Sequence, residues 1–387
     1  MLNKDFLKQI DWVTIVLMLI LVAIGLISIA SITAEPFSGK EAALADYVKK
    51  LNLYYVQKQA VNFLVGLAVF LIVIAVDYKV YKYIIRYAYI AIVALLCIVF
   101  VTTRVRGIQG WFQLGFIDRA LQPGELCKIC IIIALSQVVS TSMDRTGRLS
   151  GIKTILFAML LVLIPSALVM AQPDFGTAFV YVCIMVFIFF IGRISWGYIA
   201  AAAGALAVAA PLAYFYLLSD LQKGRIQVFL DPTLDLQDAG YNVSQAKLAI
   251  GSGQLSGKGF FTEGTLAQLR FVPERHTDFI YAGIVEGLGF IGGALIIVLY
   301  FTLLFRWLYI AIKTKDSFAS CLVIGVCGMM AAHVFENIGM TIGLVPVTGI
   351  PLPFISYGGS NLLTNMIGVG IVENIWIRRP KKRRSNS

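Results

Sequence analysis

The chain has 387 residues, of which 59% are hydrophobic and only 14% are charged, and its formal net charge is +11. In a soluble globular domain about half of the residues are apolar and about a quarter are charged. This composition therefore excludes a soluble globular protein and indicates a polytopic membrane protein. The positive charge does not indicate nucleic-acid binding, because no soluble domain carries basic patches interleaved with aromatic residues. Cytoplasmic loops and attraction to anionic lipid account for it.

Ten apolar segments are long enough to cross a bilayer, which takes about 17 to 25 residues each. The first, Ile10 to Ile32, is too long for the core of a signal peptide and is expected to be retained as a helix. The sequence therefore predicts an all-α membrane protein with ten transmembrane helices. They fall near 11–33, 57–76, 83–102, 122–140, 153–171, 175–192, 196–218, 279–309, 317–342 and 352–377.

An even number of spans puts both termini on one side, and the distribution of Lys and Arg decides which side. With both ends inside, the inner segments hold 18 Lys and Arg and the short outer loops hold 7. Both termini are therefore predicted to be cytoplasmic. The connection 219–278 is then one long extracytoplasmic loop between helices 7 and 8, in which Val243 to Ile250 is predicted to form an amphipathic helix. The chain is interpreted as a single transmembrane domain, 1–387, that ends in a basic cytoplasmic tail, 378–387.

The loop that leads into the eighth span is rich in ionisable side chains. Glu274, Arg275, His276 and Asp278 fall just before the long apolar run. Ionisable groups at the mouth of a membrane helix are costly to bury, so they are functional candidates. The structural alternative is a solvated loop end in which Thr277 or Asp278 caps the helix. Local sequence leaves both interpretations open.

Three further polar features lie near the predicted outer ends of spans. Glu125 and Lys128, three residues apart on one helix face, form either a structural ion pair or, with the helix start, a site for a phosphate. Asp174, in the turn before the sixth span, is either a helix cap or a substrate-binding carboxylate. The segment Pro351 to Ser360 mixes Pro, Gly and hydroxyl residues, and such backbone at membrane depth is buried in protein or lines a wet cavity. All three features face the same side as Asp278.

Other chemistries receive less support from the sequence. His276 and Asp278 with another carboxylate could hold a divalent cation, but nothing in the spacing requires one. The C-x-x-C motif at 127–130 lacks a second pair at metal-site spacing, so its cysteines are interpreted as small buried hydrophobes. His333, on an apolar face, is interpreted as a satisfied core residue. No metal site and no cofactor is assigned, and a divalent cation remains an open alternative.

The chain carries, in order, the motifs GWFQLG (110–115), LQPGELCK (121–128), QPDFGT (172–177), FLDP (229–232), GYNVSQAKLAIGSGQLSGKG (240–259), FVPERHTDFI (271–280), NIGM (337–340) and LPFISYGGS (352–360). Together they resemble the RodA/FtsW/SpoVE family of cell-wall polymerases, the SEDS proteins. The resemblance covers nearly the whole chain, and the 240–280 block with SYGGS is its most specific part. PERHTDF is more similar to the RodA branch than to the FtsW branch.

The resemblance implies a peptidoglycan glycosyltransferase that polymerises lipid II at the outer face of the plasma membrane, for cell-wall elongation and cell shape. It implies as partners a class B penicillin-binding transpeptidase and other membrane proteins of the elongation complex. The family's essential acid falls on Asp278, and its span-4 acid and lysine fall on Glu125 and Lys128. The chain departs from the family pattern at Gly110 and at the Gly that follows Glu286.

Glycan polymerisation requires a base at the acceptor hydroxyl and positive charge at the leaving pyrophosphate. Asp278 is predicted to be the general base. Lys128, oriented by Glu125 and assisted by Arg275, is predicted to stabilise the pyrophosphate. The predicted substrate site is completed by Asp174, His276 and Trp111. Trp111 could stack on a sugar ring, and an anchor at the membrane interface explains it as well.

Two rival classes of function stay open on the sequence: a lipid II flippase and a non-catalytic scaffold for a penicillin-binding protein. Transporters often have inverted repeats and binding sites near the bilayer midplane. This chain shows no internal symmetry, and its polar groups gather at the predicted outer edge. That distribution favours chemistry at the outer face over translocation.

Overall fold

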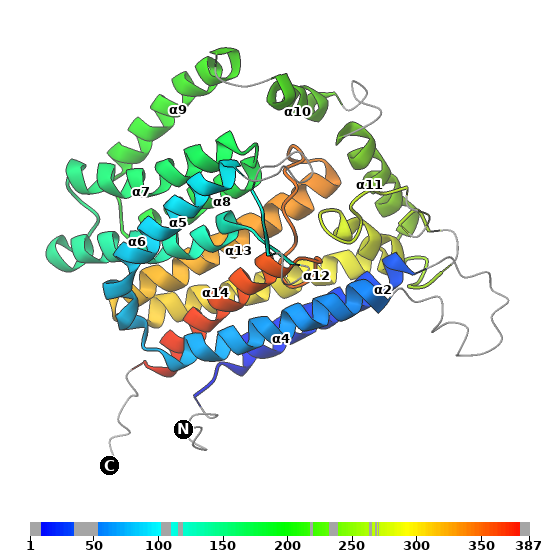
Figure 1. Ribbon diagram of the computed structural model, residues 1–387, viewed down its shortest axis with the longest axis horizontal. Coiled ribbons are helices and arrows are strands. Elements are labelled where there is room, and N and C mark those ends of the chain that lie inside the picture. Colours follow the sequence, from blue (N-terminus) through cyan, green and yellow to red (C-terminus); the bar gives the residue numbers. More distant parts are fainter. Residues whose placement is uncertain are drawn as a thin grey trace.

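The computed structural model describes residues 9–34, 53–101, 110–114, 119–216, 220–231, 239–262, 265–267, 269 and 271–379. In these residues the regular structure is helical apart from one short antiparallel hairpin, and most helices pack side by side in one bundle (Figure 1). The prediction of an all-helical polytopic membrane protein is confirmed. The elements are α2 (Trp12–Thr33), α4 (Leu53–Ala75), η1 (Tyr78–Val80), α5 (Tyr81–Ile98), η2 (Val99–Val101), β1 (Phe112–Leu114), β2 (Arg119–Leu121), α6 (Pro123–Thr146), α7 (Ile152–Ala171), α8 (Phe175–Ile191), α9 (Trp196–Tyr216), α10 (Asp220–Leu230), α11 (Ala239–Gly253), α12 (Ile280–Lys313), α13 (Ser317–Ile342) and α14 (Gly359–Ile377).

In the described part of the chain, eight helical segments are long and apolar enough to cross a membrane, and each coincides with a predicted span. The predicted sixth span corresponds to α8, an apolar helix of only 17 residues. The tenth corresponds to α14, which has 19 residues and carries Asn and Glu side chains. The exact number of spans and the side of the membrane that each loop faces stay predictions.

Helix α13 forms the centre of the bundle. Most of its residues are buried, and it packs against α6, α8, α12 and α14. The peripheral helices instead turn large apolar side chains outward, such as Leu64 of α4 and Ile90 of α5. Outward Leu and Ile side chains suit a surface that faces lipid, because hydrocarbon does not penalise their exposure.

Helix α12 is interrupted at Gly289, whose φ of 70° and ψ of −172° lie outside the helical region. The chain after α11 folds against this interruption. The Phe290 N–H donates to the Gln254 carbonyl at 2.8 Å, and the Lys258 N–H donates to the Glu286 carbonyl at 3.0 Å. Backbone groups freed by the break are thus paired within the protein, as a low-dielectric surrounding requires.

The buried carboxylate of Glu286 also holds this connection in place. It accepts hydrogen bonds from Lys258 Nζ at 3.0 Å, from the Leu266 N–H at 2.7 Å and from the Ala267 N–H at 3.0 Å. Part of the predicted extracytoplasmic loop is therefore fixed on α12. The predicted helix at 243–250 lies within α11 and is confirmed as a helix.

Replacing Gly289 by Ala is expected to destabilise the protein by about 1–3 kcal/mol, because its backbone conformation is one that essentially only Gly adopts. A Cβ at this position would also lie 2.3 Å from the Gly257 backbone nitrogen. Thermal unfolding in detergent measures the effect. Gly204→Ala on α9 is the control, since a Cβ there meets nothing within 4 Å. Equal unfolding midpoints for the two variants would contradict the argument.

The first and last described helices meet at one end of the bundle. Arg306 Nη2 lies 2.7 Å from Asp11 Oδ1, and the Asp11 N–H donates to Glu373 Oε2 at 3.1 Å. Asp11 precedes α2, and Glu373 lies near the end of α14, so both helix ends share one side, as an even number of spans demands. Of the predicted basic tail, residues 380–387 lie outside the described residues.

Candidate active site

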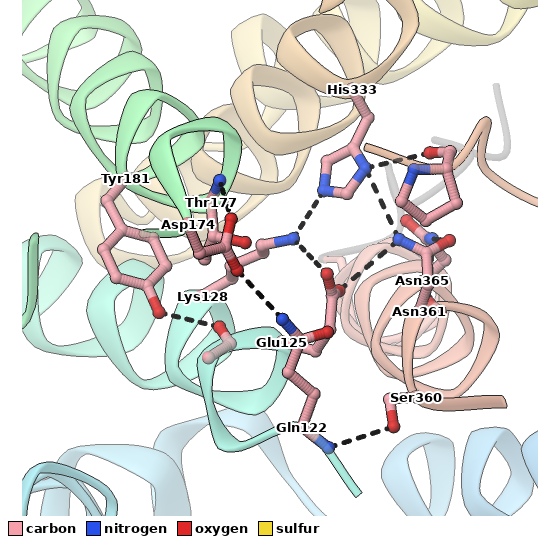
Figure 2. Close-up of polar contacts among 12 residues, drawn as sticks. Gln122, Glu125, Lys128, Asp174, Thr177, Tyr181, His333, Ser360, Asn361 and Asn365 are labelled. Carbon is pink, nitrogen blue, oxygen red and sulfur yellow. Dashed lines mark hydrogen bonds and ion pairs between the residues drawn. The ribbon is translucent and has the colours of Figure 1, made fainter. Parts of the chain in front are cut away.

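A buried ion pair lies at the start of α6. Glu125 and Lys128 are three residues apart and share one face of the helix, as predicted, with Lys128 Nζ 2.7 Å from Glu125 Oε1. The two residues are 2% and 0% exposed. Isolated charges at such burial are strongly unfavourable, so each stabilises the other. Figure 2 shows the pair between α6, α8, α13 and α14.

His333 of α13 is the second partner of Lys128, with its Nε2 2.7 Å from Lys128 Nζ. A lysine ammonium can only donate, so Nε2 accepts and the ring proton sits on Nδ1. Nδ1 lies 3.3 Å from the Pro351 carbonyl oxygen, which accepts from it. This chain of bonds fixes the neutral His333 ring in one tautomer and ties Lys128 to the segment after α13 (Figure 2).

Asp174 closes the cluster from the side of α8. It caps this helix by accepting from the Thr177 N–H at 3.0 Å, and it accepts from Gln122 Nε2 at 2.9 Å. The Gln122 N–H in turn donates to Ser360 Oγ at 3.2 Å. Burial raises the pKa of the Asp174 carboxyl, and the hydrogen bonds from Thr177 and the charge of Lys128 oppose that rise. Asp174 therefore caps α8 and also belongs to the Lys128 cluster, so its role as a cap does not exclude a role in the site.

Asp278 lies on the short segment that leads into α12 and is half-buried. Helix α12 begins at Ile280 with Phe279 at its N-cap, so neither Thr277 nor Asp278 occupies the capping position. The Asp278 N–H donates to the Glu274 carbonyl at 3.1 Å, and the Asp278 carbonyl accepts from Asn337 Nδ2 at 2.7 Å. Hydrogen bonds therefore fix the backbone of Asp278 at both its N–H and its carbonyl group.

One face of α13 links the two groups. Asn337 is 0% exposed and donates from Nδ2 to the carbonyls of both Asp278 and Ile350, each at 2.7 Å. His333, one turn earlier, bonds Lys128 and the Pro351 carbonyl. A single turn is about 5.4 Å long. Asp278 and the Lys128 cluster thus lie toward the same end of α13, joined through the 350–351 backbone.

The 350–351 backbone lies close to Asp278 because of the turn at Gly349. Its φ is +72°, a conformation that favours Gly. A Cβ built there would lie 3.5 Å from Asp278 Oδ2, so the carboxylate is next to this turn. Lys128 itself is fully buried, and a groove that connects it with Asp278 stays a prediction.

The other predicted site residues lie around Asp278 or before α6. Arg275 Nε donates to the Ile32 carbonyl at 3.1 Å, and the His276 ring lies 4.6 Å from that of Tyr55 and 5.7 Å from that of Tyr357, measured between centroids. Trp111 is half-buried directly before β1, which pairs with β2, and β2 leads into α6. This position fits either stacking on a sugar or anchoring at the interface.

Among the described residues, no three His, Cys, Asp or Glu side chains gather closely enough to hold a metal ion. The divalent cation suggested for His276 and Asp278 therefore stays an untested alternative. Of the predicted site residues, Lys128 and Arg275 carry positive charge.

Four side chains of the Lys128 cluster were not among the site residues predicted from the sequence. His333 was interpreted as core, and nothing in the spacing of α14 connected Asn361 with Glu125, whose Oε2 lies 3.4 Å from Asn361 Nδ2. A polar residue in an otherwise apolar span could have indicated each of them. The partner that such a residue contacts is known only once the packing of the helices is known. The four are Gln122, His333, Ser360 and Asn361.

Comparison with known proteins decides the family. The FtsW/RodA/SpoVE family model, described as cell cycle protein, matches residues 11–381. The chain belongs to this family. It is 37% identical over 320 residues to the peptidoglycan glycosyltransferase MrdB of Escherichia coli K12, covering 81% of this chain and 83% of MrdB. It is 31% identical over 383 residues to the probable peptidoglycan glycosyltransferase FtsW of Bacillus subtilis, covering 96% and 92%.

Solved structures share the fold. One similar chain, 25% identical with a TM-score of 0.76, belongs to a structure on the coordination of polymerization and crosslinking by a peptidoglycan synthase complex; the match covers 96% of this chain and 99% of that one. The rod shape determining protein RodA of Thermus thermophilus is 23% identical with a TM-score of 0.68, covering 96% and 98%. The predicted family is confirmed, and with it the predicted enzyme class, peptidoglycan glycosyltransferase.

Proposed function

We propose that this enzyme polymerises lipid II into glycan strands at the outer face of the plasma membrane, with Asp278 as the general base. The position of Asp278 carries the proposal. Its half-buried carboxylate stands on the polar segment before α12, and its backbone is held by Glu274 and Asn337. A general base acts only within about 2.6–3.2 Å of the proton it removes, so a fixed backbone at an accessible place is what the role needs.

In the proposed reaction, the acceptor sugar hydroxyl attacks the anomeric carbon of the donor. The bond between that carbon and the pyrophosphate oxygen breaks, and its electron pair leaves with the lipid pyrophosphate. Asp278 takes the hydroxyl proton and later returns it to water. This step creates negative charge on the leaving group, which a fixed cation can stabilise.

Lys128 is proposed to supply that charge. Its ammonium has three N–H donors, of which Glu125 and His333 accept two. The third has no acceptor among the described residues. A pyrophosphate oxygen would satisfy it, at the start of a helix whose N-terminus also favours anions. Because Lys128 is fully buried, the substrate would have to displace side chains that cover the cluster, such as Gln122.

The experiment that tests the function is polymerisation of lipid II by the purified chain in detergent, with no other enzyme present. The expected result is glycan polymer, resolved by gel electrophoresis. A flippase and a scaffold both make no glycan under these conditions. Absence of polymer from a folded, monodisperse preparation would therefore contradict the proposal and favour one of those two classes.

We further propose that the enzyme works beside a class B penicillin-binding transpeptidase and other membrane proteins of the elongation complex. The support is the similarity to a chain from a peptidoglycan synthase complex that coordinates polymerization and crosslinking. Polymer strands need crosslinking to bear load, so a partner that crosslinks fits the chemistry. Co-purification of such a transpeptidase with the tagged chain from native membranes tests the pairing.

Asn337 is expected to act on catalysis through Asp278. Replacing Asn337 by Leu removes the donor to the Asp278 and Ile350 carbonyls, and the resulting shift of the base is expected to lower kcat by roughly ten- to a hundredfold. The matched control is Asn374→Leu at the other end of the bundle, where a buried Asn also donates to backbone carbonyls. Both variants lose stability, but only the first is expected to lose kcat in the folded fraction.

A double-variant measurement separates this positioning role from a purely structural one. In the Asp278→Asn background, Asn337→Leu is expected to cause little further loss, since the group it positions no longer acts as a base. Full additivity of the two losses would show that Asn337 does not work through Asp278.

A further inference from the structure

A groove between α5, α6 and α7 lies apart from the proposed active site. It encloses about 230 Å³ and is lined mainly by apolar side chains, with Arg86 and Gln137 among them. Ala134 forms part of its floor, and Phe157 and Leu161 form the wall on α7. Lys128 sits in the first turns of α6, whereas the groove lies beside the middle of that helix.

The position of the groove across the membrane follows from two hydrogen bonds between helices. Gln137 Nε2 donates to the Lys82 carbonyl at 3.3 Å, and Tyr89 OH donates to the Leu161 carbonyl at 2.9 Å. α5 and α7 therefore begin, and α6 ends, at one end of the bundle. At 1.5 Å per residue, Arg86 lies about 8 Å and Leu161 about 14 Å from the starts of their helices. This range runs from the lipid headgroup region into the acyl chains.

One cation, Arg86, lines the groove, and a second, Lys153, lies on the face of α7 that carries Phe157. Arg86 is exposed, and Lys153, also exposed, is four residues before Phe157 and so shares its face of α7. Among the described residues, no carboxylate lies within salt-bridge distance of Arg86 or Lys153. Arg86 lies at the headgroup end of this range, where a guanidinium can reach anions at the membrane surface. The nearest abundant anion at a membrane surface is a lipid phosphate.

We propose that the groove of Arg86, Ala134, Gln137, Phe157 and Leu161 binds one anionic phospholipid. The phosphate lies against Arg86, which lines the groove, with Lys153 one turn before Phe157 on α7 as a second cation toward the helix start, and one acyl chain runs along the apolar floor. A lipid with net negative charge is favoured over a zwitterionic one, because the choline of the latter would bring another cation close to Arg86. The site is on the leaflet predicted to be cytoplasmic, opposite the proposed chemistry, and the proposal does not depend on the catalytic assignments.

Native mass spectrometry of the purified full chain tests the proposal, with phosphatidylglycerol and phosphatidylcholine of identical acyl chains titrated separately. The expected result is one tightly retained phosphatidylglycerol. Arg86→Gln is expected to weaken its apparent affinity about fivefold, the equivalent of roughly 1 kcal/mol per basic residue at a membrane surface. The control is Lys315→Gln, which removes an exposed cation near the start of α13, outside the groove, and is expected to change nothing.

A steric variant tests the acyl-chain part separately. Ala134→Phe fills the floor while Arg86 stays in place, and it is expected to weaken phosphatidylglycerol and phosphatidylcholine alike; its thermal midpoint in detergent checks that it is folded. The proposal is overturned if Arg86→Gln and Lys315→Gln behave alike, if phosphatidylcholine is retained as tightly as phosphatidylglycerol, or if folded Ala134→Phe binds normally. Displacement of phosphatidylglycerol by stoichiometric undecaprenyl phosphate would equally overturn it, by assigning the groove to a polyprenyl lipid.

Discussion

Asp278→Asn is expected to lower the rate of lipid II polymerisation by about 10²- to 10⁴-fold, the usual contribution of a general base. Asn keeps the size of Asp and leaves the backbone bonds to Glu274 and Asn337 in place, so the change removes the base without removing its support. The measurement is the initial rate of polymer formation by purified protein at saturating lipid II. The apparent KM is expected to change little, since the carboxylate acts on the hydroxyl proton rather than on binding.

The control for Asp278→Asn is Asp144→Asn, which neutralises an exposed acid near the end of α6, away from the site. Both variants are expected to show the elution profile and thermal midpoint of the unchanged protein. A polymerisation rate near that of the unchanged protein, in a correctly folded Asp278→Asn preparation, would remove Asp278 from the role of base.

The positions of the helices could be predicted from the sequence because hydrocarbon imposes a length and a composition on every span. Lipid-exposed backbone must be hydrogen-bonded internally, so a long apolar run has essentially one solution. The break at Gly289 was not predicted, since a Gly in an apolar run does not show where the chain will insert. Only the packed segment 254–259, with its backbone bonds to the freed groups of α12, reveals it.

The contact between Glu125 and Lys128 could be predicted from the sequence, but the contacts of Lys128 with other helices could not. The spacing of Glu125 and Lys128 is enough to place them on one helix face, because i and i+3 neighbours meet locally. His333 is more than two hundred residues away in sequence, and its contact with Lys128 arises from the packing of α13 on α6. A single sequence holds no direct record of such contacts, so His333 looked like an ordinary core residue.

Lys128→Met is expected to lower kcat or raise the apparent KM for the donor, because the leaving pyrophosphate loses its fixed cation. A fixed charge-assisted donor of this kind contributes typically about 10²–10³-fold in kcat. The variant has a second consequence, since it leaves the buried Glu125 carboxylate without its partner. Breaking a buried ion pair in this way destabilises a protein by about 3–5 kcal/mol, so loss of activity alone would be ambiguous.

The double variant Glu125→Gln with Lys128→Met resolves the ambiguity. It removes both buried charges together, and a neutral pair of similar volume is often as stable as the ion pair it replaces. Thermal stability is therefore expected to recover while polymerisation stays low, because the cation is still missing. If activity recovers together with stability, Lys128 serves to balance Glu125 in the core. The positive charge for the pyrophosphate must then come from another residue, and Arg275, three residues before Asp278, is the next candidate.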